Sequence, residues 1–329
     1  MSRTSFYILN EKIKLDPIFD NQSRNPQADS ALQLAVTLYI MGQLGNSTVR
    51  FCEQLQIGEG TAYLYRHRVM TALLRLLPNY LIWPKPGSDD YRTMRREIEQ
   101  DTQFPGCVGF LDGTDIGLMH APSFHGETYM NRKKVYALNM QAVCDNNLRF
   151  TFVSAGYPAS VGDPVSFGST PLFTTPGAFF SRPDEYLLGD KIYRVTRRCI
   201  TPYKEPLASQ RQDGYRYYNW MHAHSRVKIE HAIGVLKNRF RSLKLLPIYI
   251  RKKEDHTKAV SWIMCCIMLH NFLNTEKEDS TIYQPHTIIP EDEIEVDEVD
   301  EDIGPEAERA AGNEWRDRMR LYLYQNRHD

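Results

Sequence analysis

The sequence predicts an α/β protein in which a mixed sheet follows an N-terminal helical region. Between residues 107 and 203, short apolar runs are bounded by Gly, Asn and Asp, as β-strands commonly are. On both sides of this stretch, apolar residues recur at three- and four-residue spacing, which is typical of helices. The chain has 329 residues, 42% of them hydrophobic and 25% charged. It is therefore long enough for two domains and ordinary in composition for a soluble globular protein.

The net charge of −1 hides an uneven distribution. Of the 41 acidic residues, nine lie among the twelve residues 291–302, which leaves 32 acidic against 40 basic residues elsewhere. A basic body with a separate acidic tail is typical of proteins that bind polyanions such as DNA. The tail is interpreted first as a solvated, disordered segment, and competition with DNA for the basic surface is the alternative.

The cysteines indicate a reducing compartment. There are six, scattered without a C-x-x-C pair, which argues against a zinc ribbon and favours reduced, buried thiols in a cytosolic or nuclear protein. No signal peptide is evident, and no apolar run is long enough for a membrane span.

Residues 30–82 are predicted to form a helical region of helix-turn-helix type, after a polar, irregular leader at residues 1–29. A short helix, a glycine turn and a longer helix with a polar, basic face match that motif. Arg66 and Arg68 on this face are therefore candidate DNA contacts, while a three-helix bundle that only packs on its neighbour is the alternative. The three helices are expected to begin at Ser30, Ser47 and Thr61.

Residues 83–106 are predicted to be a stiff Trp-Pro-Lys-Pro-Gly linker and a connecting helix, and residues 107–275 a second domain. The first strand is expected to end at Asp112, although an Asp-Gly pair is also a common turn. Three consecutive strands joined by a hairpin turn favour an antiparallel start to the sheet. Strands are expected at 107–112, 135–144, 150–156, 186–190 and 200–203, and a short helix at 163–173.

The strongest helix pattern lies at Asn219–Leu243, with a buried stripe that includes Ile229, Ile233 and Leu236. Arg226, Glu230, Lys237 and Arg241 share a face beside that stripe. A further apolar helix is expected at residues 256–273. Residues 276–329 then hold the acidic tail and an amphipathic helix over 307–324.

Three acids are the candidate catalytic and metal-binding residues. Asp112 and Asp190 are each predicted at the end of an apolar strand, and Glu230 on the long helix. In a sheet of this connectivity the first and fourth strands lie side by side, so that the three carboxylates can meet. Three crowded acids repel one another unless a cation is present, and Mg²⁺ prefers carboxylate oxygens. Two such ions can activate water and stabilise the leaving group in phosphodiester cleavage.

Basic residues near these acids are candidate contacts for the DNA backbone. The cluster Arg132-Lys133-Lys134 follows the first strand, and Arg226, Lys237 and Arg241 flank Glu230. His222 and His224 form an H-x-H pair, which we interpret as surface or DNA-backbone residues because they occur at a polar helix start. Asp163 is a rival for the second acid, but at the beginning of a helix it is interpreted as an N-cap.

Taken together, these motifs resemble those of the PIF/Harbinger transposases and the harbinger transposase-derived nucleases, an RNase H-like group with a DDE triad. The resemblance covers about residues 30–273. It implies that Asp112, Asp190 and Glu230 bind Mg²⁺ or Mn²⁺, with two ions in the site. The matching motifs are Leu111-Asp112-Gly113-Thr114, Asn131-Arg132-Lys133, Val143-Cys144-Asp145, Leu187-Leu188-Gly189-Asp190, Thr201-Pro202-Tyr203, Ser225-Arg226 to Ile229-Glu230, Leu236-Lys237 with Arg239-Phe240, and Leu269-His270-Asn271.

The resemblance further implies action in the nucleus on double-stranded DNA with terminal inverted repeats, often with a Myb-like partner protein, and a homodimer stays open. The chain departs from the family pattern at Asp115, where many relatives have His. It also departs at Pro158-Ala159-Ser160 and Gly162-Asp163, where relatives often read Pro-Gly-Ser and His-Asp.

Two functions follow. In the first, metal-activated water cuts the element ends, and the freed 3′-hydroxyl attacks target DNA. In the second, the chain is a domesticated, catalytically silent DNA-binding protein that acts through its helix-turn-helix and recruits partners. The presence of all three acids favours the nuclease.

Overall fold

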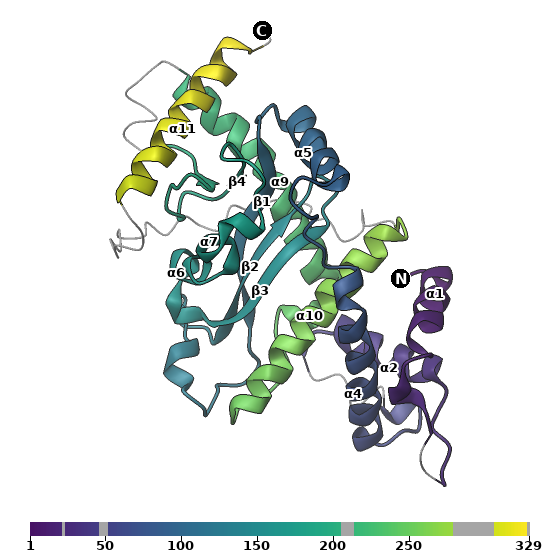
Figure 1. The fold of residues 1–329 in the computed structure, drawn as a ribbon. Helices are drawn as coiled ribbons and strands as arrows, with labels where there is room; N and C mark the ends of the chain where they lie inside the picture. The colour runs from purple at the N-terminus through teal and green to yellow at the C-terminus, as the bar shows by residue number, and fades with distance from the viewer. Residues whose placement is uncertain (22–23, 46–51, 205–213, 279–305, 328–329) are drawn as a thin grey trace.

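The computed structural model describes residues 1–329 except 22–23, 46–51, 205–213, 279–305 and 328–329 (Figure 1). A five-stranded mixed sheet in the order β3-β2-β1-β4-β5 forms the centre of the molecule. β1 pairs antiparallel with β2 and parallel with β4, and β2 pairs antiparallel with β3. The expected antiparallel start and the neighbouring first and fourth strands are therefore confirmed. The strands are β1 (Cys107–Gly117), β2 (Ala137–Cys144), β3 (Phe150–Pro158), β4 (Tyr186–Leu188) and β5 (Cys199–Ile200).

The prediction that β1 ends at Asp112 is wrong, and Asp112-Gly113 is not a turn. β1 continues to Gly117 because β2 supplies partners along the whole length, from Phe110↔Cys144 to Gly117↔Ala137. The pairing that stops near Asp112 is the one with β4, whose last pair is Phe110↔Leu188. Asp112 therefore lies within a strand that is still paired with β2, but two residues beyond the last pair with β4.

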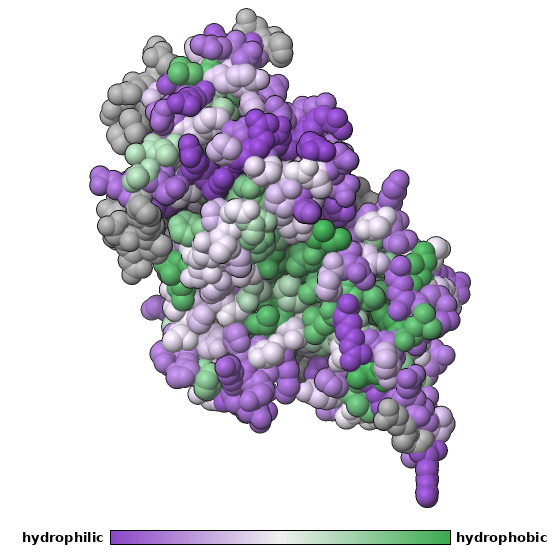
Figure 2. All heavy atoms as spheres, in the orientation of Figure 1, coloured by the Kyte–Doolittle hydropathy of each residue, from purple (hydrophilic) through white to green (hydrophobic). Residues whose placement is uncertain are grey.

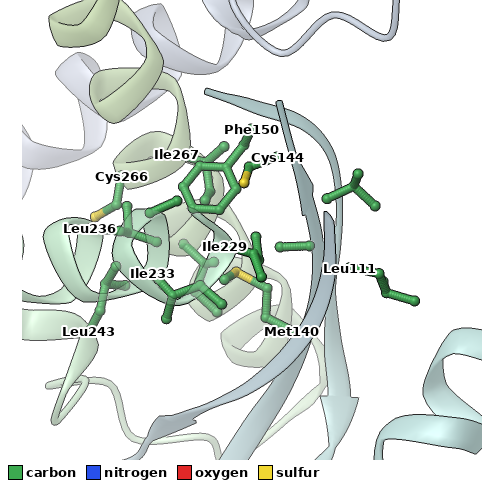
Figure 3. Packing of buried hydrophobic residues seen from close by; sticks show 14 of the residues in the cluster. Leu111, Met140, Cys144, Phe150, Ile229, Ile233, Leu236, Leu243, Cys266 and Ile267 are labelled. Atoms are coloured by element: carbon green, nitrogen blue, oxygen red, sulfur yellow. The ribbon is translucent and has the colours of Figure 1, made fainter. Parts of the chain in front are cut away.

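The long helix α9 (Tyr215–Arg239) packs its apolar stripe between the sheet and α10 (Lys253–Thr275). Ile229 and Leu236 are fully buried. In Figure 3 the stripe points toward the inner strands and α10, whereas Leu111 points to the opposite side of the sheet. On that opposite side lie α6 (Asp163–Gly168) and α7 (Pro171–Thr174). The helix expected at 163–173 is therefore two short helices, and the second starts at Pro171, which cannot donate a backbone hydrogen bond.

The N-terminal helices pack beside α10 (Figure 1). The expected irregular leader is corrected here, because residues 3–13 form a helix. Ser2 caps it by accepting from the backbone N–H of Ser5, and Leu9 and Ile13, four residues apart, are buried. The second helix expected from Ser47 falls mostly outside the described residues. The helices of this part are α1 (Arg3–Ile13), α2 (Ser30–Gly42), α4 (Glu59–Leu76) and α5 (Asp89–Thr102).

Figure 2 shows hydrophobic side chains gathered in the middle of one face, over the junction of β3, α10 and α4, with hydrophilic side chains toward both ends. At this junction α4 packs directly on α10. Among the described residues, all six cysteines are free thiols and buried, as expected. None of the described helices combines the length and the apolar character needed to cross a membrane.

The C-terminal amphipathic helix is confirmed as α11 (Glu306–Gln325), which packs on α9 and on the edge strand β5. Tyr203 Oη donates to Asp317 Oδ1 at 2.5 Å, and Arg316 lies over the Tyr203 ring at 4.1 Å. Because an edge strand has unpaired backbone groups, a helix beside β5 limits pairing with another chain. The acidic run 291–302 lies outside the described residues.

Candidate active site

Asp112 and Asp190 lie side by side because β1 and β4 are parallel and their last pair is Phe110↔Leu188. Each acid stands two residues after the last paired residues, Phe110 and Leu188. Side chains alternate along a strand, so residues at equal distance from one pair point to the same face. The Asp190 backbone is fixed by neighbouring bonds, with Gly189 N–H donating to Ile200 O at 3.0 Å and Tyr193 N–H to Asp190 O at 3.0 Å.

Glu230 joins these acids from α9, and Arg226 lies among all three. The Arg226 guanidinium is 3.3 Å from Asp112 Oδ2, 3.4 Å from Asp190 Oδ1 and 3.8 Å from Glu230 Oε1. Arg226 and Glu230 are four residues apart and therefore share one face of the helix. The structure thus brings the three predicted acids around one buried cation of the chain itself.

The electrostatics of the cluster favour binding of positive charge. The pKa of Asp112 is raised to about 7, mainly by burial and also by Asp190, Asp163 and Glu230, while Arg226 opposes the shift. Burial also raises the pKa of Glu230, with Arg226 opposing and Asp190 adding to the shift. One guanidinium therefore does not fully compensate three neighbouring carboxylates, and a further cation would stabilise their ionised forms.

The donor set, three carboxylates, is the type that Mg²⁺ and Mn²⁺ prefer. In the arrangement described, however, the acids converge on Arg226. Within the described part of the chain, no three His, Cys, Asp or Glu side chains lie close enough together to hold one ion. The chemistry of the site fits a divalent cation, whereas the expected spacing around shared ions is not seen.

Lys237 does not extend into solvent from α9. Its Nζ donates to Thr114 Oγ1 at 2.6 Å and to the backbone oxygen of Asp115 at 2.9 Å, which connects α9 to β1 beside Asp112. Arg241 is exposed and belongs to a 3₁₀ turn after α9 ends at Arg239, so it does not share the helical face as expected.

The other predicted DNA contacts are distributed over two regions. Arg132, Lys133 and Lys134 are exposed in the loop between β1 and β2. On α4, Arg68 is partly exposed, whereas the Arg66 guanidinium lies over the rings of Tyr63 and Trp262, at 4.6 and 4.9 Å. Arg66 therefore contributes to packing between α4 and α10, and DNA contact by this face stays a prediction.

Two interpretations from the sequence are corrected. His222 is buried rather than on the surface, with Nε2 3.2 Å from Ile200 O, and burial lowers its pKa to about 3. Asp163 is not the N-cap of α6, since Gly162 occupies that position and no side chain caps the helix. The Asp163 carboxylate is instead bonded to two amides of β2.

These two amide residues, Asn139 and Gln141, were not predicted from the sequence. Both are buried in β2, where all eight residues are buried, and both donate to Asp163 Oδ1 at 2.7 Å. Two polar residues at alternate positions of an otherwise apolar strand were the available signal, because buried amides need hydrogen-bond partners.

Comparisons with known proteins give matches over the segment that contains this site. A family model described as "DDE superfamily endonuclease" matches residues 111–271, which include all three acids. "Protein ALP1-like" of Arabidopsis thaliana is 23% identical over 301 residues, spanning 86% of this chain and 70% of that protein. "Putative nuclease HARBI1" is 25% identical over 280 residues in Bos taurus, spanning 83% and 76%, and 29% identical over 253 residues in Rattus norvegicus, spanning 76% and 68%. No solved structure gives a significant match. Residues 111–271 therefore belong to the DDE superfamily endonucleases, and the chain is related to the harbinger transposase-derived nucleases.

Proposed function

We propose that this chain is a divalent-metal-dependent DNA endonuclease of the transposase type. It cuts phosphodiester bonds at the ends of an element and joins the 3′-hydroxyl to target DNA. The observation that carries the proposal is the convergence of Asp112, Asp190 and Glu230 on one guanidinium, within a segment that matches DDE endonucleases. An RNase H-like domain over residues 107–275 and a helix-turn-helix-like region over 30–82 are part of the proposal.

Asp112, Asp190 and Glu230 are the residues that would hold the metal, Mg²⁺ or Mn²⁺, with two ions as the expected number. When bound, these ions supply an activated water and stabilise charge on the attacking and leaving oxygens. The acids differ in exposure, with side chains 22%, 38% and 32% exposed respectively. Each carboxylate is therefore within reach of solvent and of a substrate that approaches this face.

Arg226 and Lys237 position the site. The Arg226 side chain is only 10% exposed, and its contacts with the three acids hold them together against their mutual repulsion. Lys237 fixes α9 against β1 through Thr114 and Asp115.

We further propose that double-stranded DNA with terminal inverted repeats binds through exposed and partly exposed cations outside the acid cluster. The loop Arg132-Lys133-Lys134, Arg241 and Arg68 would contact phosphates, which position DNA without reading its sequence. Action in the nucleus, a Myb-like partner protein and a homodimer belong to the same proposal.

A second candidate function is a catalytically silent DNA-binding protein. The observation that favours it is the position of Arg226, since a guanidinium among the acids partly compensates the charge that a metal ion would compensate. The two candidates make different predictions about metal binding and cleavage, although both predict DNA binding.

The test combines calorimetry with a cleavage assay. Mg²⁺ or Mn²⁺ is titrated into the purified full chain, and the same ions are added to DNA that carries the inverted repeats flanking the gene. Heat of binding, together with cuts at the repeat ends, is the result expected of the nuclease. DNA binding with neither metal uptake nor cutting would establish the silent protein instead.

A further inference from the structure

Behind the three acids, on the opposite face of the sheet, a fourth carboxylate is held by hydrogen bonds from two buried amides. Asp163 Oδ1 accepts from Asn139 Nδ2 and from Gln141 Nε2, each at 2.7 Å. The Gln141 amide also donates to Asn139 Oδ1 at 2.8 Å. Both amides are almost completely buried, so each would lose a needed partner without Asp163.

The geometry of β1 puts this network on the reverse face. Gln141 pairs with Gly113 and Asn139 with Asp115, so these residues point away from the face of Asp112 and Thr114. A Cβ at Gly113 would collide with the Asp163 carboxyl group and with Gln141 Nε2. Because Gly113 has no side chain, the Asp163 carboxyl group can lie against β1 at the residue that follows Asp112.

The network extends to the Asp190 loop through Tyr193. The Tyr193 hydroxyl donates to Gln141 Oε1 at 2.6 Å, and its backbone N–H donates to Asp190 O at 3.0 Å. The ring of Tyr193 also packs edge-on against Phe167 of α6, with centroids 5.6 Å apart. One continuous set of contacts therefore runs from Asp163 through Gln141 and Tyr193 to the backbone of Asp190.

We propose that Asp163 is a positioning residue of the active site, which fixes the Asp190 loop against β1 through Gln141 and Tyr193. Its role in cleavage rests on the proposed function, whereas its role in ordering the loop does not. Asp163 does not contact the reacting groups in this proposal, because it acts from the reverse face of the sheet. Its carboxylate serves as a hydrogen-bond acceptor, and both bonds end on the same oxygen.

Two substitutions of Asp163 distinguish its role as a hydrogen-bond acceptor from a role of its negative charge. Asp163→Asn retains Oδ1 as an acceptor for both amides but removes the charge, whereas Asp163→Ala removes the acceptor. We expect Asp163→Ala to cut roughly 10- to 100-fold more slowly at saturating DNA, with little change in KM, because misplacement of a catalytic group costs about that much. The cleavage rate of Asp163→Asn should stay within about threefold of that of the original protein, because the variant retains the acceptor oxygen for both amides.

Hydrogen–deuterium exchange of the full chain tests the ordering of the loop independently of cleavage. In Asp163→Ala and in Tyr193→Phe, peptides that cover residues 189–195 should exchange faster, while those from α4 should not change. Tyr193→Phe retains the ring that packs on Phe167, and it therefore serves as the second variant if Asp163→Ala does not fold. Asp163→Asn should show the exchange of the original protein.

The outcomes separate the two proposals. Unchanged exchange at 189–195 in both Asp163→Ala and Tyr193→Phe would overturn the positioning role, whether or not the protein cuts DNA. If Asp163→Asn is as inactive as Asp163→Ala, the charge is required and the acceptor role is wrong. A chain that never cuts DNA but shows the expected exchange would overturn the nuclease and leave the positioning role supported.

Discussion

Arg226 is the side chain through which the three acids of the candidate site interact. Its guanidinium contacts Asp112, Asp190 and Glu230 within 3.3–3.8 Å, and it is nearly buried. Removal of one acid therefore changes the charge that the other two and Arg226 experience. Asp112 is the most buried of the three side chains, and its pKa is raised to about 7.

This pKa makes a prediction about stability and pH. The unfolded Asp112 releases its proton near its ordinary pKa of 3.8, whereas the folded protein retains it until about pH 7. Over this range the unfolded state binds fewer protons, so the folded state loses stability as pH rises. Between pH 5 and 8 the original protein should therefore lose roughly 3 kcal/mol in free energy of unfolding through Asp112. Asp112→Asn should not show this loss, because it has no group that titrates at this position.

Urea unfolding at the two pH values, without divalent cations, measures this difference. Asp255→Asn is the matched control, because the pKa of the partly buried Asp255 is lowered by its hydrogen bond with Lys258, so that the group is ionised throughout this range. The control should follow the original protein at both pH values. An Asp112→Asn variant that does the same would show that Asp112 ionises normally in the fold.

The sheet and α9 place the acids, and their sequence patterns explain which parts of the fold could be predicted. The positions of the strands and of α9 followed from apolar patterns, which report burial directly. The continuation of β1 past Asp112 did not, because residues 112–115 are polar or Gly and are kept in the strand by pairing with β2. The helix α1 was missed because two of its four buried residues, Ser5 and Asn10, are polar, so that its apolar pattern is weak.

The site shows the same division. The three acids were predicted because each one follows or accompanies an apolar element. Burial of His222 and the bonds of Asp163 depend on Phe104, Ile200 and β2, which are distant in sequence. Single-sequence patterns carry no information on such contacts, so a polar residue at a helix start was interpreted as exposed.

The apolar stripe of α9 makes the position of Glu230 depend on the core. Leu236 is fully buried beside Ile233 and Leu243 (Figure 3). We expect Leu236→Ala to reduce the free energy of unfolding by about 2–5 kcal/mol, because it removes buried methyl groups and leaves a cavity. Equilibrium urea unfolding measures the loss.

Leu321→Ala is the matched control for this prediction. Leu321 lies on α11 and is 46% exposed, so the same substitution should cost less than about 1 kcal/mol. Equal losses in the two variants would contradict the packing of α9 described above.

Across the whole molecule, the terminal segments pack on the sheet layer rather than standing apart from it. α4 packs on α10, and α11 covers β5 and part of α9. The acidic run 291–302 lies in the sequence between α10 and α11, and its nine acids more than offset the net positive charge of the remaining chain, which has 40 basic and 32 acidic residues. The charge distribution therefore predicts an effect of this run on DNA binding.

Replacement of the nine acids by Asn and Gln retains the length of the segment and removes its charge. We expect tighter non-specific DNA binding and a steeper dependence of the affinity on salt, because an acidic segment of the same chain no longer competes with DNA for the basic surface. Fluorescence anisotropy with a short duplex between 50 and 200 mM salt measures both quantities. Equal affinities at the lowest salt would show that the acidic run does not shield the basic surface.

The most direct measurement of the proposed chemistry compares cleavage and DNA binding in Glu230→Gln. Gln retains the size and helix propensity of Glu but removes one charge from the acid cluster. The triad predicts loss of metal-dependent cleavage by at least about 100-fold, several kcal/mol of transition-state stabilisation, with DNA affinity unchanged or slightly raised. If Glu230 only pairs with Arg226 along α9, at 3.8 Å, the substitution costs about 0.2–0.5 kcal/mol and cleavage continues. Normal Mg²⁺-dependent cutting by the Gln variant would therefore remove Glu230 from the catalytic site.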